Sequence, residues 1–183
     1  MAKSKGGSAR HDFQSRTRGG GVEVIGTQIF AGKEPRPGLI NPVKNDGWVK
    51  PRGGLWTSSD LKGGTSDWVR WCTVEQFRGP RFNLWGLEVK NDARVFVIDS
   101  MSDLHSLYNK YPGQSNYKMV LDYEKIANDF DGINLTENGQ ASTRWGSASF
   151  PHKKLDLYGW DCESTLWFRW VFDSVKYLGV YKM

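Results

Sequence analysis

The first third of the chain alternates short apolar runs with turn-forming residues. Apolar residues at 22–25 and 29–30 predict a first strand, and four prolines between positions 35 and 51 predict a long irregular loop. Residues 53–59 predict a short strand that begins at a glycine pair and ends in three hydroxyl side chains. Long loops inside compact domains are often functional, so this region is the first place to look for a binding site.

Helical periodicity first occurs after Ser66, whose side chain is a suitable N-cap. Trp68, Trp71, Cys72 and Glu75 follow at the spacing i, i+3, i+4 and i+7, which predicts a helix to about residue 77 with a largely aromatic face. This spacing is typical of a helix that packs on a core, so we interpret Trp68 and Trp71 as core residues.

Two strand-like runs follow, at residues 82–89 and 93–99. The residues between them, Lys90-Asn91-Asp92, have the composition of a tight turn. The pattern therefore predicts an antiparallel hairpin.

Two more helices are predicted in the second half. Ser102 is a suitable N-cap for a helix that stops before Pro112, and apolar residues at helical spacing between 120 and 130 predict another. A short strand at 133–136 follows, and residues 137–154, rich in Ser, Thr, Asn and Gly, predict a polar loop.

The last segment alternates clearly. From Cys162 to Phe172 every second residue is largely apolar, while the residues between them are mixed polar, which predicts a strand with one apolar face. Asp173-Ser174 interrupts the pattern, and residues 175–181 predict one more strand. Because short strands outnumber helices without a regular βαβ alternation, the fold class is α+β with mainly antiparallel strands.

Length and charge indicate one folded domain and a basic arm. The chain has 183 residues and a net charge of +5, and residues 1–21 hold five basic residues and one acidic residue. Most of the net charge therefore belongs to this Gly- and Ser-rich segment, which we expect to be a flexible arm, with residues 22–183 forming a single α+β domain. The arm is either a solvated tail or a contact to nucleic acid, a partner protein or an assembly.

The sequence lacks the motifs that are typical of several classes of protein. Cys72 and Cys162 are too few for a disulfide framework and lie in no zinc-type cluster, so we expect no metal. The three histidines are scattered, and neither GxGxxG, GxxxxGK[ST] nor GxSxG occurs. Without a long apolar segment or a signal-peptide pattern, the expectation is a cytoplasmic protein with no membrane association.

Asp161 and Glu163 are the strongest candidates for chemistry. Two residues apart on a strand, they place two carboxylates on one face, about 6–7 Å apart between Cα atoms. Such a pair can stabilise a developing cation or hold a sugar hydroxyl. The alternative is that both carboxylates simply face solvent at the beginning of a strand.

Residues 53–59 also allow two interpretations. The glycine pair and the three hydroxyls either receive the amide and ribose of a ligand or make an ordinary turn.

Taken in order, these features resemble the ADP-ribosyltransferase fold, over about residues 22–180. The resemblance rests on Gly54-Leu55-Trp56-Thr57-Ser58-Ser59, the helix with Trp68 and Trp71, the turn Phe130-Asp131-Gly132-Ile133, and Asp161-Cys162-Glu163. It implies two packed sheets of short strands, a hydroxyl strand that supports an NAD site, and a late acidic motif at which Asp161 stands where the family usually has Glu or Gln. The pattern also resembles small bacteriophage-encoded proteins, whose location would be the host cytoplasm or the virion.

The resemblance implies a role for each site residue. Glu163 would stabilise the oxocarbenium-like ribose formed when nicotinamide leaves, and Asp161 would orient the incoming nucleophile. Backbone groups of Gly54 or Leu55 would hold the carboxamide, Trp56 would stack on the nicotinamide, and Thr57, Ser58 and Ser59 would support the NAD site. NAD would be a consumed substrate, without a further cofactor or a metal, and the acceptor would be a host protein, a nucleic acid or water.

A non-catalytic interaction protein is the competing hypothesis. In that case residues 1–21 would fasten the chain to nucleic acid, another acidic partner or a phage particle.

Overall fold

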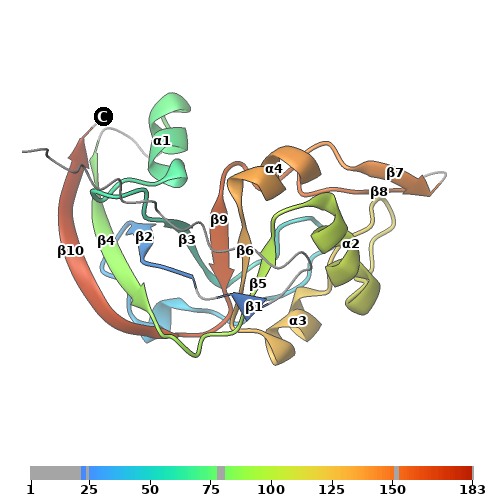
Figure 1. Ribbon diagram of the computed structural model, residues 1–183, viewed down its shortest axis with the longest axis horizontal. Coiled ribbons are helices and arrows are strands. Elements are labelled where there is room, and N and C mark those ends of the chain that lie inside the picture. The colour runs from blue at the N-terminus through green and yellow to red at the C-terminus, as the bar shows by residue number, and fades with distance from the viewer. Residues whose placement is uncertain (1–21, 24, 78–80, 151–152, 183) are drawn as a thin grey trace, which may run out of the picture.

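The computed structural model describes residues 22–23, 25–77, 81–150 and 153–182 (Figure 1). The basic arm, residues 1–21, therefore lies outside the described residues. The strands are β1 (Val22–Glu23), β2 (Gln28–Ala31), β3 (Leu55–Ser59), β4 (Arg81–Val89), β5 (Val95–Ile98), β6 (Gly132–Leu135), β7 (Ser147–Phe150), β8 (Lys153–Leu155), β9 (Ser164–Trp167) and β10 (Phe172–Lys182). The helices are the 3-10 turn η1 (Pro37–Leu39), α1 (Asp67–Val74), α2 (Met101–Lys110), α3 (Tyr123–Asp129) and α4 (Glu137–Thr143).

The main strands form one hydrogen-bonded sheet in the order β1-β5-β6-β9-β3-β2-β4-β10, and β7 and β8 form a separate pair. Among the described strands, β5 and β6 run parallel and the other neighbours are antiparallel. The predicted α+β class with mainly antiparallel strands is confirmed. The expected two packed sheets are not confirmed, because β3 bonds to β9 on one side and to β2 on the other and so joins both groups of strands into one sheet.

The predicted hairpin at residues 82–99 is wrong in its pairing. Both strands exist and the turn closes, with the Ala93 N–H donating to the Lys90 carbonyl, but β4 pairs with β2 and β10 whereas β5 pairs with β1 and β6. Each residue of β5 is buried, as expected for an interior strand that is covered on both faces. The chain therefore leaves one end of the sheet at β4 and enters the other at β5.

Four further expectations need correction. The predicted first strand is two strands, because β1 pairs with β5 while β2 lies between β3 and β4. The polar loop at 137–154 contains helix α4 and the β7–β8 pair. The polar face of the last segment is buried rather than open, since each residue of β9 is buried. The strand predicted from Cys162 to Phe172 is shorter, because β9 ends at Trp167 and β10 already begins at Phe172, so that Asp173-Ser174 forms a bulge inside β10 rather than a break before it.

The caps explain where the helices begin. Ser66 accepts a hydrogen bond from Val69 N at the start of α1, as predicted, and Asp122 does the same for α3. The cap of α2 is Ser100 rather than Ser102. Thr136 caps α4 by accepting from Gly139 N.

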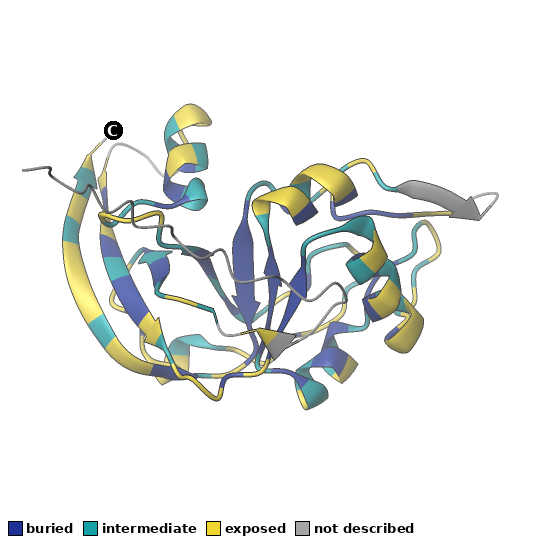
Figure 2. Cartoon of the chain, viewed as in Figure 1, coloured by how far each residue is buried: buried dark blue, intermediate teal, exposed yellow. Residues whose placement is uncertain are grey.

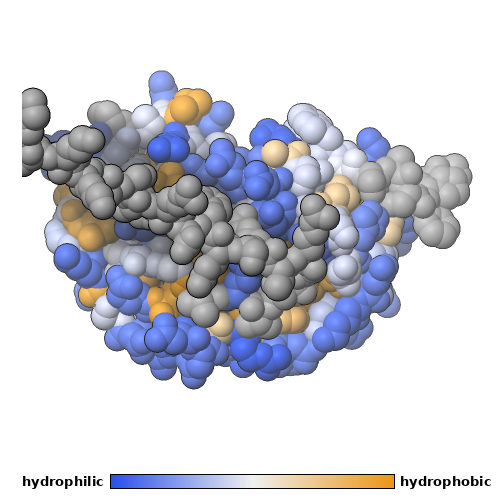
Figure 3. Space-filling model, viewed as in Figure 1, coloured by the Kyte–Doolittle hydropathy of each residue, from blue (hydrophilic) through white to orange (hydrophobic). Residues whose placement is uncertain are grey.

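The core lies on both faces of the sheet (Figure 2). Helices α2 and α3 bury their apolar side chains against β5, β6 and β9, and α1 buries Val69 and Cys72 against β2 and β4. Trp68 and Trp71 stack on each other with ring centroids 5.0 Å apart and are only half-buried, so they contribute the rim of this core rather than its centre. On the face in Figure 3, hydrophilic side chains dominate the lower rim. Of the helices in the described ranges, none has the length and apolar character to cross a membrane.

Candidate active site

The structure brings the predicted hydroxyl strand and the predicted acidic motif together at Glu163. Ser58 Oγ and Ser59 N donate to Glu163 Oε2 at 2.6 and 2.9 Å. Ser59 Oγ and Asn134 Nδ2 donate to Oε1 at 2.8 and 2.9 Å. Glu163 is only 9% exposed. The four hydrogen bonds compensate for the hydrogen bonds to water that the carboxylate loses on burial. The alternative of a solvent-facing Glu163 is therefore wrong.

A buried polar network extends from this carboxylate across the sheet. Asn134 Nδ2 also donates to Thr165 Oγ1 at 2.9 Å. Thr57 lies opposite Thr165 on the neighbouring strand, and Thr165 lies opposite Asn134. Thr57 Oγ1 donates to Gln28 Oε1 at 2.8 Å and accepts from Trp167 Nε1 at 2.7 Å. Every member has a partner, which is the condition under which a buried polar network holds one defined geometry.

The glycine pair before β3 lets the chain approach itself closely. Gly53 and Gly54 have φ angles of +79° and +69°, a region that favours glycine. A Cβ on Gly53 would lie 2.4 Å from the Pro42 carbonyl oxygen, and one on Gly54 would lie 2.3 Å from Leu166 Cδ1. Because the Gly54 N–H already donates to the Asn41 carbonyl at 2.8 Å, that group is not available to hold a carboxamide.

A cavity of about 390 Å³ adjoins these residues. Its wall is largely apolar and aromatic, and it is lined by Phe30, Ala31, Lys50, Gly54, Leu55, Trp56, Thr57, Trp68, Phe77, Asp161, Cys162 and Ser164. Cys162 and Ser164, on either side of Glu163, both face it. Of the eight predicted NAD-binding or catalytic residues, five line this cavity, namely Gly54, Leu55, Trp56, Thr57 and Asp161. The other three, Ser58, Ser59 and Glu163, are not among its lining residues.

Asp161 and Glu163 do not form a pair. Asp161 is 37% exposed and accepts a hydrogen bond from Lys50 Nζ at 2.8 Å. The same ammonium lies 5.5 Å from the centre of the Trp56 ring, which in turn packs edge-on against Trp160. The two carboxylates therefore have different surroundings, one wet and paired with a cation, the other buried among neutral donors.

The surroundings of Cys162 disfavour the thiolate, which is the nucleophilic form of the side chain. Burial, and after it the nearby carboxylates of Glu163, Asp67 and Asp161, raises the pKa of its thiol to about 12. The thiol is therefore protonated at neutral pH. Within the described ranges, no group of three or more metal-ligating side chains is present.

Three site residues were missed at the sequence level. Asn134 lies inside the apolar run of β6, and a polar residue at such a position is a usable signal for a buried hydrogen bond. Gln28 gives the same signal at the start of β2. Lys50 gives none, because only the tertiary fold brings it to Asp161, 111 residues away.

No family model, curated protein or solved structure matches this chain.

Proposed function

We propose that the chain uses NAD⁺ as a substrate and transfers its ADP-ribosyl group to a macromolecule, or to water. The observation that supports this most is the convergence of Ser58 and Ser59 on the Glu163 carboxylate, across 105 and 104 residues of sequence, beside an aromatic cavity. A cavity of about 390 Å³ is in the range of small-molecule sites and accommodates a part of NAD⁺, not the whole molecule.

The chemistry requires a fixed negative charge near the reacting sugar. The bond between the nicotinamide nitrogen and ribose C1′ breaks, its electron pair leaves with nicotinamide, and positive charge grows on the ribose. Glu163 is held by four donors, and three of them, Ser58 Oγ, Ser59 N and Asn134 Nδ2, keep the carboxylate in position while charge develops. Ser59 is half-buried, so its hydroxyl is the donor that a ribose 2′-hydroxyl replaces on Oε1.

The remaining lining residues take simple roles. The cationic nicotinamide ring stacks on Trp56 or Trp68. Asp161, released from Lys50, accepts the proton of the incoming nucleophile, which then forms the new bond to C1′. The carboxamide is held by groups other than the Gly54 N–H, which is occupied by Asn41.

The test is nicotinamide release from NAD⁺ by wild type, Glu163→Gln and Trp68→Leu, with and without bacterial lysate. We expect release by wild type, loss in Glu163→Gln, and a raised KM in Trp68→Leu, because the last change removes a ring from the cavity without touching Glu163. Dependence on lysate indicates transfer to a macromolecule, and its absence indicates hydrolysis. Release that is equal in wild type and Glu163→Gln, or absent from wild type, contradicts the proposal.

The variant needs a stability control. In Glu163→Gln an NH₂ group replaces one carboxylate oxygen, so the donors that bind this oxygen lose their acceptor. We expect this to lower the free energy of unfolding by roughly 1–3 kcal/mol. Thermal unfolding is therefore measured for each variant, with Glu34→Gln as the matched change of an exposed carboxylate. Lost activity counts only where Glu163→Gln is folded at the assay temperature.

One observation favours the competing function, a non-catalytic interaction protein. The protein itself fills both oxygens of Glu163 and pairs Asp161 with Lys50, an arrangement that serves stability without any substrate. That function uses the basic arm, residues 1–21. Its test is deletion of the arm, which is expected to abolish salt-sensitive binding to nucleic acid or an acidic partner. Unchanged binding by the truncated chain contradicts it.

A further inference from the structure

Exposed aromatic side chains gather on one part of the surface. Among the described residues, Trp48, Tyr117, Trp145 and Tyr158 are 69%, 84%, 69% and 52% exposed. They line two hollows of about 610 and 430 Å³ that share Tyr117 and Lys118. We call these four rings the aromatic surface. Large rings left in water this way are typical of a binding surface, since isolated exposed rings would be scattered.

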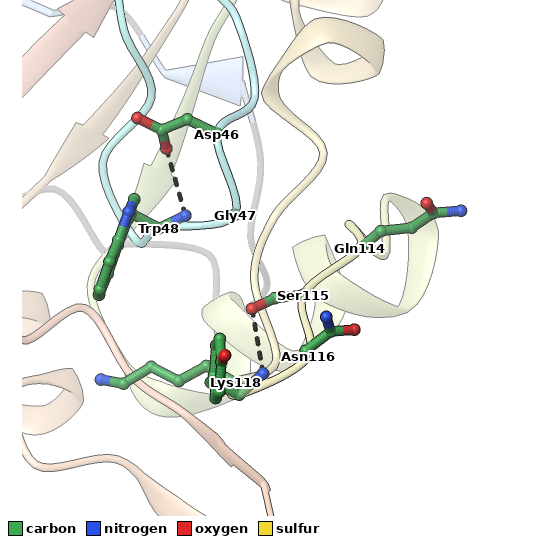
Figure 4. Close-up of a pocket in the computed structure, with 8 residues that line it drawn as sticks. Asp46, Gly47, Trp48, Gln114, Ser115, Asn116 and Lys118 are labelled. Atoms are coloured by element: carbon green, nitrogen blue, oxygen red, sulfur yellow. Dashed lines mark hydrogen bonds between the residues drawn. The ribbon is translucent and has the colours of Figure 1, made fainter.

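Two loops, which contain Trp48 and Tyr117, form one part of the aromatic surface, and Figure 4 shows residues of both loops around the first hollow. Trp48 N donates to Asp46 Oδ1, and Asn45 fixes the start of this loop by bonding to Asp122 and to Tyr123 N. Tyr117 N donates to Ser115 Oγ in the second loop.

The second loop is also tied to the segment around β8. Lys153 Nζ donates to the Ser115 carbonyl, and Lys118 pairs with Asp156 at 3.0 Å. The rings are therefore carried by ordered backbone, which lowers the entropy cost of binding.

One cation lies over two of the rings, and a second lines the same hollow. The Arg144 guanidinium is 5.6 Å from the Trp145 ring centre and 5.9 Å from that of Tyr158, and Lys154 lines the same hollow. The acidic residues here are already paired, Asp156 with Lys118 and Asp46 with Arg52. Within the described ranges, Arg144, Lys153 and Lys154 form no ion pair with a carboxylate, so this surface carries uncompensated positive charge.

We propose that the aromatic surface binds a single-stranded nucleic acid. Its bases stack on the four rings, and its phosphates contact Arg144, Lys153 and Lys154. A neutral sugar or an apolar peptide would leave these cations unused, and a duplex would hide the base faces that the rings contact. This inference is independent of the proposed function, because none of these residues lines the cavity beside Glu163.

The test measures binding of a fluorescent single-stranded oligo(dT) to the full chain by anisotropy. We expect Trp48→Ala, Tyr117→Ala and Trp145→Ala each to weaken binding by about tenfold, with the salt dependence unchanged because a ring carries no charge. Arg144→Ala and Lys154→Ala are each expected to reduce the slope of log K against log salt by about 0.7. Tyr177→Ala, an exposed aromatic change on β10, is the matched control and leaves binding unchanged.

Three results would overturn this inference. The first is wild-type affinity in all three ring variants, which would assign any binding to charge elsewhere in the chain. The second is equal affinity for a duplex of the same length. The third is competition by polyglutamate as effective as that by unlabelled oligo(dT), which would show that the surface recognises negative charge in an acidic protein rather than bases.

Discussion

At the scale of single residues, position decides what a carboxylate does. Asp161 and Glu163 differ by one methylene and two positions, yet Asp161 shares an exposed ion pair with Lys50, whereas Glu163 is buried among neutral donors. An exposed pair of this kind contributes at most about 1 kcal/mol, while removing the partners of a buried charge is costly. Because Glu163 is buried, Glu163→Gln is expected to lower the stability of the fold as well as the activity.

Cys162 gives a prediction of pH dependence. Its thiol has a pKa raised to about 12 in the folded chain from a usual value of 9.0, so its contribution to stability is fully present below about pH 9 and is lost as pH rises through about 12. We expect the free energy of unfolding, measured with urea, to fall between about pH 8 and about pH 10.5, and to fall less steeply in Cys162→Ala. Burial also raises the pKa of the Tyr123 and Tyr111 hydroxyls, and the hydrogen bond with Tyr111 raises the pKa of Lys110, so these groups contribute to the remaining slope. Identical slopes in variant and wild type would refute the assignment to Cys162.

At the scale of elements, α4 depends on one glycine. A Cβ on Gly139 would lie 2.0 Å from the Ile98 carbonyl oxygen, a backbone atom that cannot move without shifting β5. Ala favours a helix over Gly by about 1 kcal/mol, but overpacking against backbone costs about 1–3 kcal/mol or more, so the clash wins. Gly139→Ala is expected to lower the free energy of unfolding in urea. The control is Gly26→Ala, which meets nothing within 4 Å and is expected to have little effect. Equal stability of the two variants would contradict this.

The same elements show what local sequence can and cannot specify. Helices α1, α2 and α3 were predictable from their apolar periods. The capping residue was predicted correctly for α1 alone, because Ser66 was named, whereas Ser102 was named for α2 and no cap was named for α3. Helix α4 was not, because Asn138, Gly139 and Ser142 have low helix propensity and the helix is held by its cap and by packing on β5. For strand β5 the sequence predicted the strand but not its neighbours. Its pairing with β1 and β6 is set by tertiary packing rather than by the adjacent turn.

At the scale of the whole molecule, the site was predictable only in part. The residues on β3 and those just before β9 were singled out in the sequence, and the structure brings Ser58 and Ser59 together with Glu163. Periodicity alone would not have joined Ser58 to Glu163, because the two residues are 105 positions apart in the sequence. The sequence gives even less indication of the aromatic surface, because its rings come from separate segments that only the fold brings together.

The last prediction concerns cooperativity and the expected single domain at residues 22–183. Strand β3 bonds to both β9 and β2, and β9 contributes Leu166 to the core under α2 and α3 and Trp167 to the core on the other face. The strands on the two sides of β3 cannot separate without exposing buried apolar side chains. We therefore expect one two-state unfolding transition.

Urea unfolding followed by far-UV circular dichroism and by tryptophan fluorescence measures this, and the two midpoints are expected to coincide. Leu166→Ala removes a fully buried side chain and is expected to lower both midpoints together, by about 2–5 kcal/mol in stability. Separate midpoints, or a shift in one probe alone, would show that the sheet unfolds as two units and that β3 is a joint between them rather than part of a common core.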